Sequence, residues 1–243
     1  MQRRVLIDAG NTGLKWAAVE DGKWLAQGRC DYADWSALRA HLAPGSRCFI
    51  ASVTTAANEA RLAALLEAAA IDSVWLQAEH AFEDLRNTYL NPGQLGVDRW
   101  MGLIGARGRT RSPALVVSVG TAMTVDALSA DGVFLGGVIV PGVTLMRQAL
   151  LQGTAQVAAA AGQWQAFPRT TADAVHSGIV AALCGAILAQ YSRLGEAAGT
   201  APVCLLTGGD AETVLPRLGV PAELVPGLIL EGINRVAVRG SAG

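Results

Sequence analysis

The sequence has few cysteines and no excess of charge of either sign. Its four cysteines are widely spaced and form no C-x-x-C pair, so we expect buried free thiols in a reducing compartment. The 19 basic and 20 acidic residues leave a formal charge of −1. This balance indicates neither a nucleic-acid surface nor a polybasic membrane anchor. Any charged ligand must therefore be bound by a few local groups.

Long hydrophobic runs are also missing. The longest run, residues 179–189 with Gly185 inside it, is too short to span a bilayer and suits a core helix. Asp8 comes so early that the first residues lack the continuous apolar segment of a signal peptide. We therefore expect a cytoplasmic protein that does not enter a membrane.

The usual nucleotide-binding motifs are absent too, but a different phosphate-type turn opens the chain. No G-x-x-x-x-G-K-[ST] occurs, and no G-x-G-x-x-G follows a predicted strand. Instead, an apolar run ends at Asp8 and meets the turn formers of residues 10–13. Glycines there let the backbone turn sharply with its N–H groups outward, which suits phosphate oxygens, and Asp8 could hold Mg²⁺ directly or through water. An ordinary hairpin is the alternative interpretation.

The second half of the chain repeats the first at a constant offset of 110 positions. Residues 115–122 align with residues 5–12, and Asp131-Gly132 aligns with Asp21-Gly22. We interpret this as a duplication of two related α/β domains, 1–112 and 113–243, with an active-site cleft between them. Two facing turns would hold a nucleoside triphosphate, with Gly120, Thr121 and Thr124 on the second side and residues 207–210 near its base or ribose.

A candidate acceptor site lies at Gly96-Val97-Asp98-Arg99. Asp98 would accept the proton of an attacking hydroxyl, and Arg99 could grip a substrate carboxylate with two hydrogen bonds. The alternative is that Asp98 caps a helix and Arg99 faces solvent. The role of Lys15 is also undecided, because the alternation of side chains along a strand could direct it toward the phosphates or into solvent. Trp100 and Trp16 are expected in the core.

Four ordered motifs carry a family resemblance. Residues 8–12 (DAGNT), 96–100 (GVDRW), 120–124 (GTAMT) and 136–142 (GGVIVPG) resemble successive signatures of the type III pantothenate kinases and of the Bvg accessory factor proteins grouped with them. The resemblance implies an acetate and sugar kinase/Hsc70/actin type fold with two ribonuclease H-like domains. It further implies a homodimer, with dimerisation helices in the second domain, and ATP-dependent phosphorylation of pantothenate in coenzyme A biosynthesis.

By motif position, the resemblance also implies roles for individual residues. Asp98 would be the catalytic base, and Thr171 would reach the substrate from the partner subunit. ATP would be bound by Asp8, Ala9, Gly10, Asn11, Thr12, Gly13, Leu14, Lys15 and Thr121, and pantothenate by Tyr89, Gly96, Val97, Asp98, Arg99 and Thr171.

One position departs from the family pattern. Many members carry an aspartate two residues before the Gly-Thr-Ala turn, where it binds a monovalent cation, and here that position is Ser118. A hydroxyl contributes a ligand without charge, so K⁺ or NH₄⁺ binding is expected to be weaker or absent. Asp126 could substitute only if its side chain turns inward. The departure also leaves open a nucleotide-binding regulatory module with little or no kinase activity. A kinase for another hydroxy acid is a third interpretation.

Overall fold

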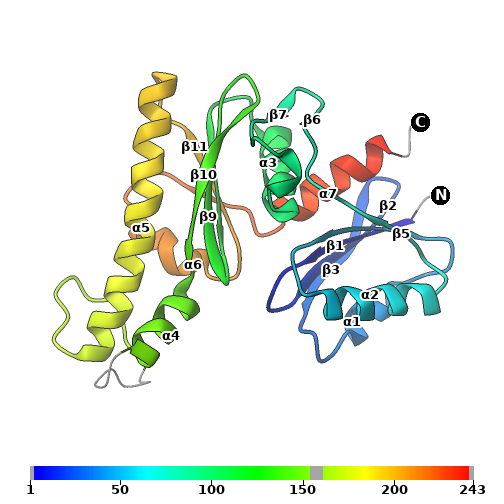
Figure 1. Cartoon of the computed structure of the whole chain (residues 1–243), viewed down its shortest axis with the longest axis horizontal. Helices are drawn as coiled ribbons and strands as arrows, with labels where there is room; N and C mark the ends of the chain where they lie inside the picture. The colour runs from blue at the N-terminus through cyan, green and yellow to red at the C-terminus, as the bar shows by residue number, and fades with distance from the viewer. Residues whose placement is uncertain (1–2, 154–160, 241–243) are drawn as a thin grey trace. The chain divides into compact units, whose positions relative to one another are not determined.

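The computed structural model describes residues 3–153 and 161–240, which form two compact units (Figure 1). Unit 1 contains residues 1–109 and 227–243, and unit 2 contains residues 110–226. The C-terminal helix α7 (Leu228–Arg239) therefore belongs to unit 1, whereas the sequence-based division at 112/113 assigned it to the second half. Residues 154–160, part of a predicted loop, lie outside the described residues.

Unit 1 contains a five-stranded sheet of order β3-β2-β1-β4-β5. The pairs β1/β2 and β2/β3 are antiparallel, while β1/β4 and β4/β5 are parallel. Six of the seven residues of the central strand β1 are buried, as expected for a strand covered on both faces. The strands are β1 (Arg3–Ala9), β2 (Leu14–Glu20), β3 (Lys23–Cys30), β4 (Arg47–Ser52) and β5 (Asp72–Trp75).

Two helices of unit 1 cross with their backbones in contact. A Cβ atom added to Gly232 of α7 would lie 1.9 Å from the Met101 carbonyl oxygen of α3 (Val97–Arg109). One added to Gly105 of α3 would lie 2.3 Å from the Leu228 carbonyl oxygen. Since only glycine allows this approach, these positions fix α3, which carries the candidate acceptor residues.

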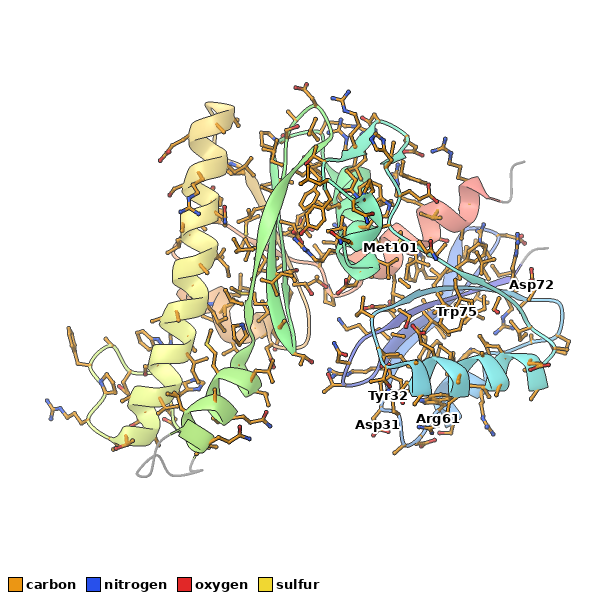
Figure 2. The ribbon with its side chains drawn as sticks, viewed as in Figure 1. Asp31, Tyr32, Arg61, Asp72, Trp75 and Met101 are labelled. Carbon is orange, nitrogen blue, oxygen red and sulfur yellow. The ribbon has the colours of Figure 1, made fainter. Side chains whose placement is uncertain are left out.

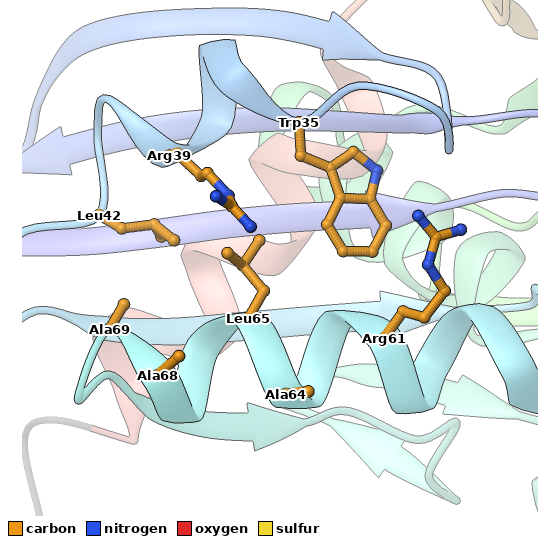
Figure 3. A pocket seen from close by; sticks show the side chains of 8 residues that line it. All are labelled: Trp35, Arg39, Leu42, Arg61, Ala64, Leu65, Ala68 and Ala69. Atoms are coloured by element: carbon orange, nitrogen blue, oxygen red, sulfur yellow. The ribbon is translucent and has the colours of Figure 1, made fainter.

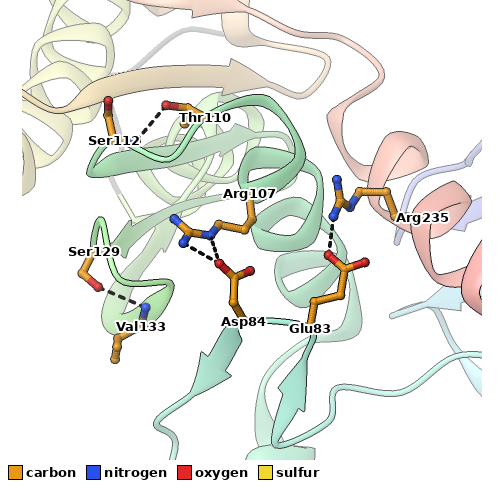
Figure 4. Close-up of polar contacts among 8 residues, drawn as sticks. All are labelled: Glu83, Asp84, Arg107, Thr110, Ser112, Ser129, Val133 and Arg235. Atoms are coloured by element: carbon orange, nitrogen blue, oxygen red, sulfur yellow. Dashed lines mark hydrogen bonds and ion pairs between the residues drawn. The ribbon is translucent and has the colours of Figure 1, made fainter.

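Ion pairs attach a small hairpin to these helices. The hairpin joins β6 (Ala81–Phe82) to β7 (Leu85–Asn87). At its turn, Asp84 pairs with Arg107 of α3 and Glu83 pairs with Arg235 of α7 (Figure 4). The remaining helical elements of unit 1 are α1 (Ser36–Arg39), α2 (Ala56–Ala68) and the 3₁₀ turn η1 (Pro92–Gln94).

Unit 2 repeats the strand order of unit 1. Its strands run β12-β11-β8-β9-β10, with β8/β9 and β9/β10 antiparallel and β8/β11 and β11/β12 parallel. The predicted duplication is therefore visible in topology as well as in sequence. The strands are β8 (Ala114–Val119), β9 (Ala122–Leu128), β10 (Val133–Pro141), β11 (Val203–Thr207) and β12 (Glu223–Leu224).

The constant offset of 110 holds at the two ends of this repeat but fails between them. Four residues, 10–13, join β1 to β2, whereas only Gly120 and Thr121 join β8 to β9, so β9 begins two residues early. The next connection restores the offset, because residues 129–132 take the place of Asp21-Gly22. The two phosphate-type turns thus differ in length, which ungapped matching could not show.

The described part of unit 2 contains two main helices, of which one is long and apolar. Helix α5 (Thr171–Ala198) has 28 residues and is long and apolar enough to cross a membrane by length and composition, with 33% of its most apolar window buried. The core helix of a soluble protein passes the same test. Helix α4 (Val143–Gly153) has no buried residue. Short segments α6 (Ala211–Val214) and η2 (Leu215–Arg217) complete the unit.

Candidate functional site

The end of β1 places a buried carboxylate opposite a lysine. Asp8 is 8% exposed and pairs directly with Lys15 on β2, so both side chains lie on the same face of the sheet. Burial raises the pKa of Asp8 to about 7; the Asp98 charge also raises it, while Lys15 opposes the change. Burial lowers the pKa of Lys15; the Asp8 charge raises this pKa, and the Arg29 charge lowers it further. Lys15 is therefore directed to the Asp8 side rather than into open solvent.

The turn after β1 is held together internally. The Gly10 N–H donates to the Gly13 carbonyl at 3.0 Å, and Tyr32 Oη donates to the Gly10 carbonyl at 2.6 Å. Neither glycine has a positive φ, so this turn does not use the left-handed backbone conformation that glycine favours. Glycine at 13 is instead required by a close approach, because a Cβ there would lie 2.6 Å from the Cys30 carbonyl oxygen. Asn11 and Thr12 are exposed at the tip.

The acceptor motif opens helix α3 in the same unit. The Asp98 carboxyl lies over Gly96, where an added Cβ would be 2.6 Å from Asp98 Oδ1. Burial raises the pKa of Asp98, although the backbone N–H and the charge of Arg99 and the backbone of Asp98 itself lower it. The capping alternative placed Asp98 before the helix, but α3 begins at Val97, so Asp98 lies inside its first turn. Its carboxylate still accepts from backbone N–H groups there. It also lies close enough to Asp8 to raise the pKa of that residue.

Arg99 is buried rather than solvated. It is 7% exposed, its Nη1 donates to Tyr89 Oη at 2.8 Å, and its guanidinium lies 5.7 Å from the centre of the Tyr89 ring. This contradicts the alternative in which Arg99 faces solvent. Tyr89 in turn donates its backbone N–H to Asn87 Oδ1 at 3.1 Å. Asn87 was not selected from the sequence, although it is 3% exposed and also binds the carbonyls of Glu79 and Pro92.

In unit 2, three glycine-containing segments meet at the end of β8. Gly142 donates its N–H to the Thr121 carbonyl at 2.9 Å, and a Cβ added there would lie 1.9 Å from the Gly120 carbonyl oxygen. Gly208 has φ +101° and approaches Val119, where an added Cβ would be 2.1 Å from the carbonyl oxygen. The third glycine-rich segment predicted from the sequence is thus beside the Gly120-Thr121 turn.

Ser118 belongs to a row of hydroxyls across three strands. It pairs with Thr124 on β9 and with Thr207 on β11, so the three side chains share one face of the sheet. Asp126 pairs with Val116, two positions along β8, and is 1% exposed. The side chain of Asp126 therefore does turn inward on this face, as a charge substitute for Ser118 would require.

Thr171 is the first residue of α5, but it is not the helix cap. Thr170 has the extended conformation of an N-cap, and its Oγ1 accepts the Asp173 N–H at 3.1 Å. Thr171 is exposed at a groove of about 570 Å³ between α4 and α5. The groove is lined by Pro141, Met146, Ala149, Leu150, Thr171, Ala174, Val175, Gly178, Ile179 and Ala182.

The donor set suits a magnesium ion that is bound mainly through its substrate. Within residues 3–153 and 161–240, no group of three or more His, Cys, Asp or Glu side chains is arranged to hold a metal. Mg²⁺ is commonly held by one or two carboxylates together with phosphate oxygens and water. Asp8 fits that role, because a nearby cation would stabilise its buried ionised form.

Solved structures define the class of protein. A Baf family transcriptional activator from Campylobacter jejuni matches with a TM-score of 0.65 and 19% identity, covering 98% of this chain and 100% of the other. An activator of 2-hydroxyisocaproyl-CoA dehydratase from Clostridium difficile with bound ADPNP matches with a TM-score of 0.53 and 8% identity, covering 100% and 98%. The chain has the ATPase fold of the actin, Hsc70 and sugar kinase group.

Sequence comparison then gives the family. The model of the type III pantothenate kinases matches residues 4–193. The type III pantothenate kinase of Thiobacillus denitrificans is 64% identical over 240 residues, covering 99% of this chain and 98% of that protein. That of Aromatoleum aromaticum is 42% identical over 241 residues, covering 98% and 99%. The chain belongs to the type III pantothenate kinase family, as its four motifs predicted.

Proposed function

We propose that this chain transfers the γ-phosphoryl group of ATP to pantothenate and forms 4′-phosphopantothenate, the entry step of coenzyme A biosynthesis. The observation that carries this proposal is the proximity of the phosphate-type turn to the acceptor motif in unit 1, where the charge of Asp98 raises the pKa of Asp8. Family membership supports the same reaction.

Asp98 is proposed as the general base. Phosphoryl transfer needs a group that orients the attacking hydroxyl and takes its proton while the γ-phosphoryl group leaves ADP. Burial raises the pKa of Asp98 and so makes its carboxylate a better proton acceptor. The primary hydroxyl of pantothenate would donate its proton to this carboxylate as its oxygen bonds to phosphorus.

Arg99 and Tyr89 are proposed to hold the pantothenate carboxylate. A guanidinium presents parallel N–H donors that match a carboxylate, and the bond to Tyr89 Oη fixes its orientation beforehand. Gly96 and Val97 complete this part of the site, because Gly96 leaves the space that the Asp98 carboxyl occupies.

ATP is proposed to bind at the turn of unit 1. Residues 8–15 would surround its phosphates, with Lys15 as a charge partner and Asp8 as the ligand of Mg²⁺, directly or through water. Magnesium bound there would neutralise negative charge on the phosphates. Thr121, in the shorter turn of unit 2, is proposed as a further ATP contact. A monovalent cation is expected to bind weakly at Ser118, unless Asp126 supplies the missing charge.

A cytoplasmic homodimer is proposed on the basis of unit 2. Helix α4 carries no buried residue and exposes Leu145 and Leu150, and the groove beside α5 is almost wholly apolar. Apolar surface of this kind is stabilised when a partner covers it. We propose that α4 and α5 form the dimer contact and that Thr171 contacts the pantothenate of the partner subunit.

Asp98→Asn tests the reaction. With Mg²⁺, ATP and pantothenate, the variant is expected to lose at least about 100-fold in kcat, because the amide cannot accept the proton. Its Kd for ATP, measured by calorimetry, should stay within about threefold of wild type. Asp21→Asn, exposed in the β2–β3 turn, is the matched control and should retain full activity.

Three results would contradict the proposal. Full turnover by Asp98→Asn would exclude Asp98 as the base. A wild-type chain that binds ATP but forms no ADP with pantothenate, with or without K⁺, would instead indicate the regulatory module, and turnover with a different hydroxy acid alone would change the assigned substrate.

A further inference from the structure

Unit 1 has a pocket of about 540 Å³ between α1 and α2, formed by residues outside the proposed kinase site (Figure 3). Its lining combines a small apolar surface with an indole and two arginines: Trp35, Arg39, Leu42, Arg61, Ala64, Leu65, Ala68 and Ala69. A second hollow of about 280 Å³ adjoins it and shares Trp35, Arg39 and Arg61. The volume of the first pocket, about 540 Å³, lies within the range of small-molecule sites in proteins.

The charge of the pocket is positive. The guanidinium groups of Arg39 and Arg61 lie on either side of Trp35 in Figure 3, and the Arg61 guanidinium is 5.0 Å from the Trp35 ring. Within the described part of the chain, the Arg39 side chain makes no hydrogen bond or ion pair. Asp34, which lines the second hollow, already accepts hydrogen bonds from the Ser36 N–H and Oγ at 2.8 and 3.0 Å.

The indole of Trp35 adds an unused donor. Trp35 is 8% exposed, and its Nε1 is buried without a hydrogen-bond partner. A buried N–H without a partner is destabilising, and an acceptor brought in by a ligand would remove that cost. In Figure 3 this nitrogen lies on the side of the ring nearer to Arg61.

We propose that this pocket binds a small amphipathic anion, namely a carboxylate or phosphate monoester that carries a short apolar chain. The oxyanion would bind the Arg39 guanidinium through charge-assisted hydrogen bonds, and the Arg61 guanidinium, on the other side of Trp35, would turn toward it. The apolar chain would cover Leu42, Leu65 and the alanines of α2, which removes apolar surface from water. An inorganic anion would gain only the hydrogen bonds to the guanidinium groups, and a neutral alcohol would gain only the burial of its apolar chain.

Tyr32 connects this pocket to the phosphate-type turn. Arg61 Nη2 donates to the Tyr32 carbonyl at 2.9 Å, and Tyr32 Oη donates to the Gly10 carbonyl at 2.6 Å (Figure 2 shows Tyr32 beside Arg61). A bound anion competes with the Tyr32 carbonyl for Arg61 and so weakens a contact that positions Tyr32. Occupancy of the pocket therefore changes ATP binding at the turn, and this second part rests on the proposed kinase function.

Calorimetry on the full chain tests the site with n-hexyl phosphate and hexanoate as probes. Inorganic phosphate and 1-hexanol serve as controls with one feature each. The better of the two amphipathic probes should bind at least about tenfold more tightly than either control, and comparing the two identifies the preferred head group. Arg39→Gln should weaken that probe at least about fivefold, whereas Arg86→Gln, exposed on β7 outside the pocket, should not.

Several outcomes would overturn the assignment. These are no binding of either probe at about 5 mM, an affinity for 1-hexanol equal to that for the probes, or full affinity in Arg39→Gln. The last result would also follow if the probe occupied the phosphate-type turn instead.

A kinetic measurement tests the connection. Saturating probe should change the KM for ATP at least about twofold in wild type and leave it unchanged in Arg39→Gln. An unchanged KM with binding intact would refute the role of Tyr32. If the chain shows no kinase activity, but the probe binds and Arg39→Gln weakens it, the proposed function fails while the pocket assignment stands.

Discussion

Asp8→Asn is expected to make the ligand-free protein more stable at neutral and alkaline pH. The pKa of Asp8 is raised from 3.8 to about 7 in the folded state, mainly by burial. Between these two values the folded state binds more protons than the unfolded state, so this group makes stability fall as pH rises. A shift of about three units corresponds to about 4 kcal/mol of destabilisation once the carboxyl is ionised in both states. Asparagine has the same shape and carries no charge.

The pH dependence gives this prediction its sign. At pH 8 nearly the whole penalty is present, whereas at pH 5 the folded carboxyl is protonated and less than half of it remains. The stabilisation by Asp8→Asn should therefore be about 2–3 kcal/mol larger at pH 8 than at pH 5. Urea unfolding in the presence of EDTA at both pH values measures this difference directly.

The matched control is Asp21→Asn, in the exposed turn between β2 and β3, where asparagine tolerates the positive φ of 47°. Its effect should stay within about 0.5 kcal/mol at both pH values. If Asp8→Asn were no more stable than wild type at pH 8, the carboxylate would not be destabilised by burial. The inference that a bound cation stabilises the ionised form of Asp8 would then fail as well.

Three further predictions concern other parts of the site and its scaffold. Gly208→Ala should lower the free energy of urea unfolding by at least about 2 kcal/mol, because Gly208 has a positive φ and its Cβ would meet a backbone carbonyl. Gly199→Ala should lower it by about half as much, because Gly199 also has a positive φ but nothing lies within 4 Å of its Cβ. Thr170→Ala should lower the free energy of urea unfolding by about 1 kcal/mol, whereas Thr171→Ala should leave it unchanged. The opposite order of the two effects would contradict the assignment of Thr170 as the cap. Arg99→Lys should raise the KM for pantothenate about tenfold and leave the KM for ATP unchanged. An equal rise in both KM values would show that Arg99 does not bind pantothenate specifically.

The sequence predicts the fold well where a short pattern sets both structure and position. The strand ending at Asp8, its copy in β8 and the start of α3 beside Asp98 all follow from local hydrophobic runs and turn residues. The pairing of Asp8 with Lys15 also follows once the turn length is known. The burial of Arg99 does not, because it depends on Tyr89, ten residues earlier.

Other features depend on contacts that no local pattern encodes. Gly13 is required by the carbonyl of Cys30, which a neighbouring strand brings to it. Asn87 and Tyr32 resemble ordinary loop residues until their distant partners are known. The sequence cannot place the cap of α5, because Thr170 and Thr171 are adjacent and chemically identical and only backbone conformation distinguishes them.

The return of α7 to unit 1 affects how the protein is made. Unit 2 is a continuous segment that can fold as soon as residue 226 has left the ribosome, whereas unit 1 must wait for a helix encoded after it. Until then α3 exposes the face that Gly232 will cover, next to the motif proposed for catalysis. A fragment ending near residue 109 would carry the residues proposed for catalysis and still lack the surface that holds them in place. Catalytic competence is therefore expected to appear only after α7 has been synthesised, although all the residues proposed for catalysis precede it by more than a hundred positions.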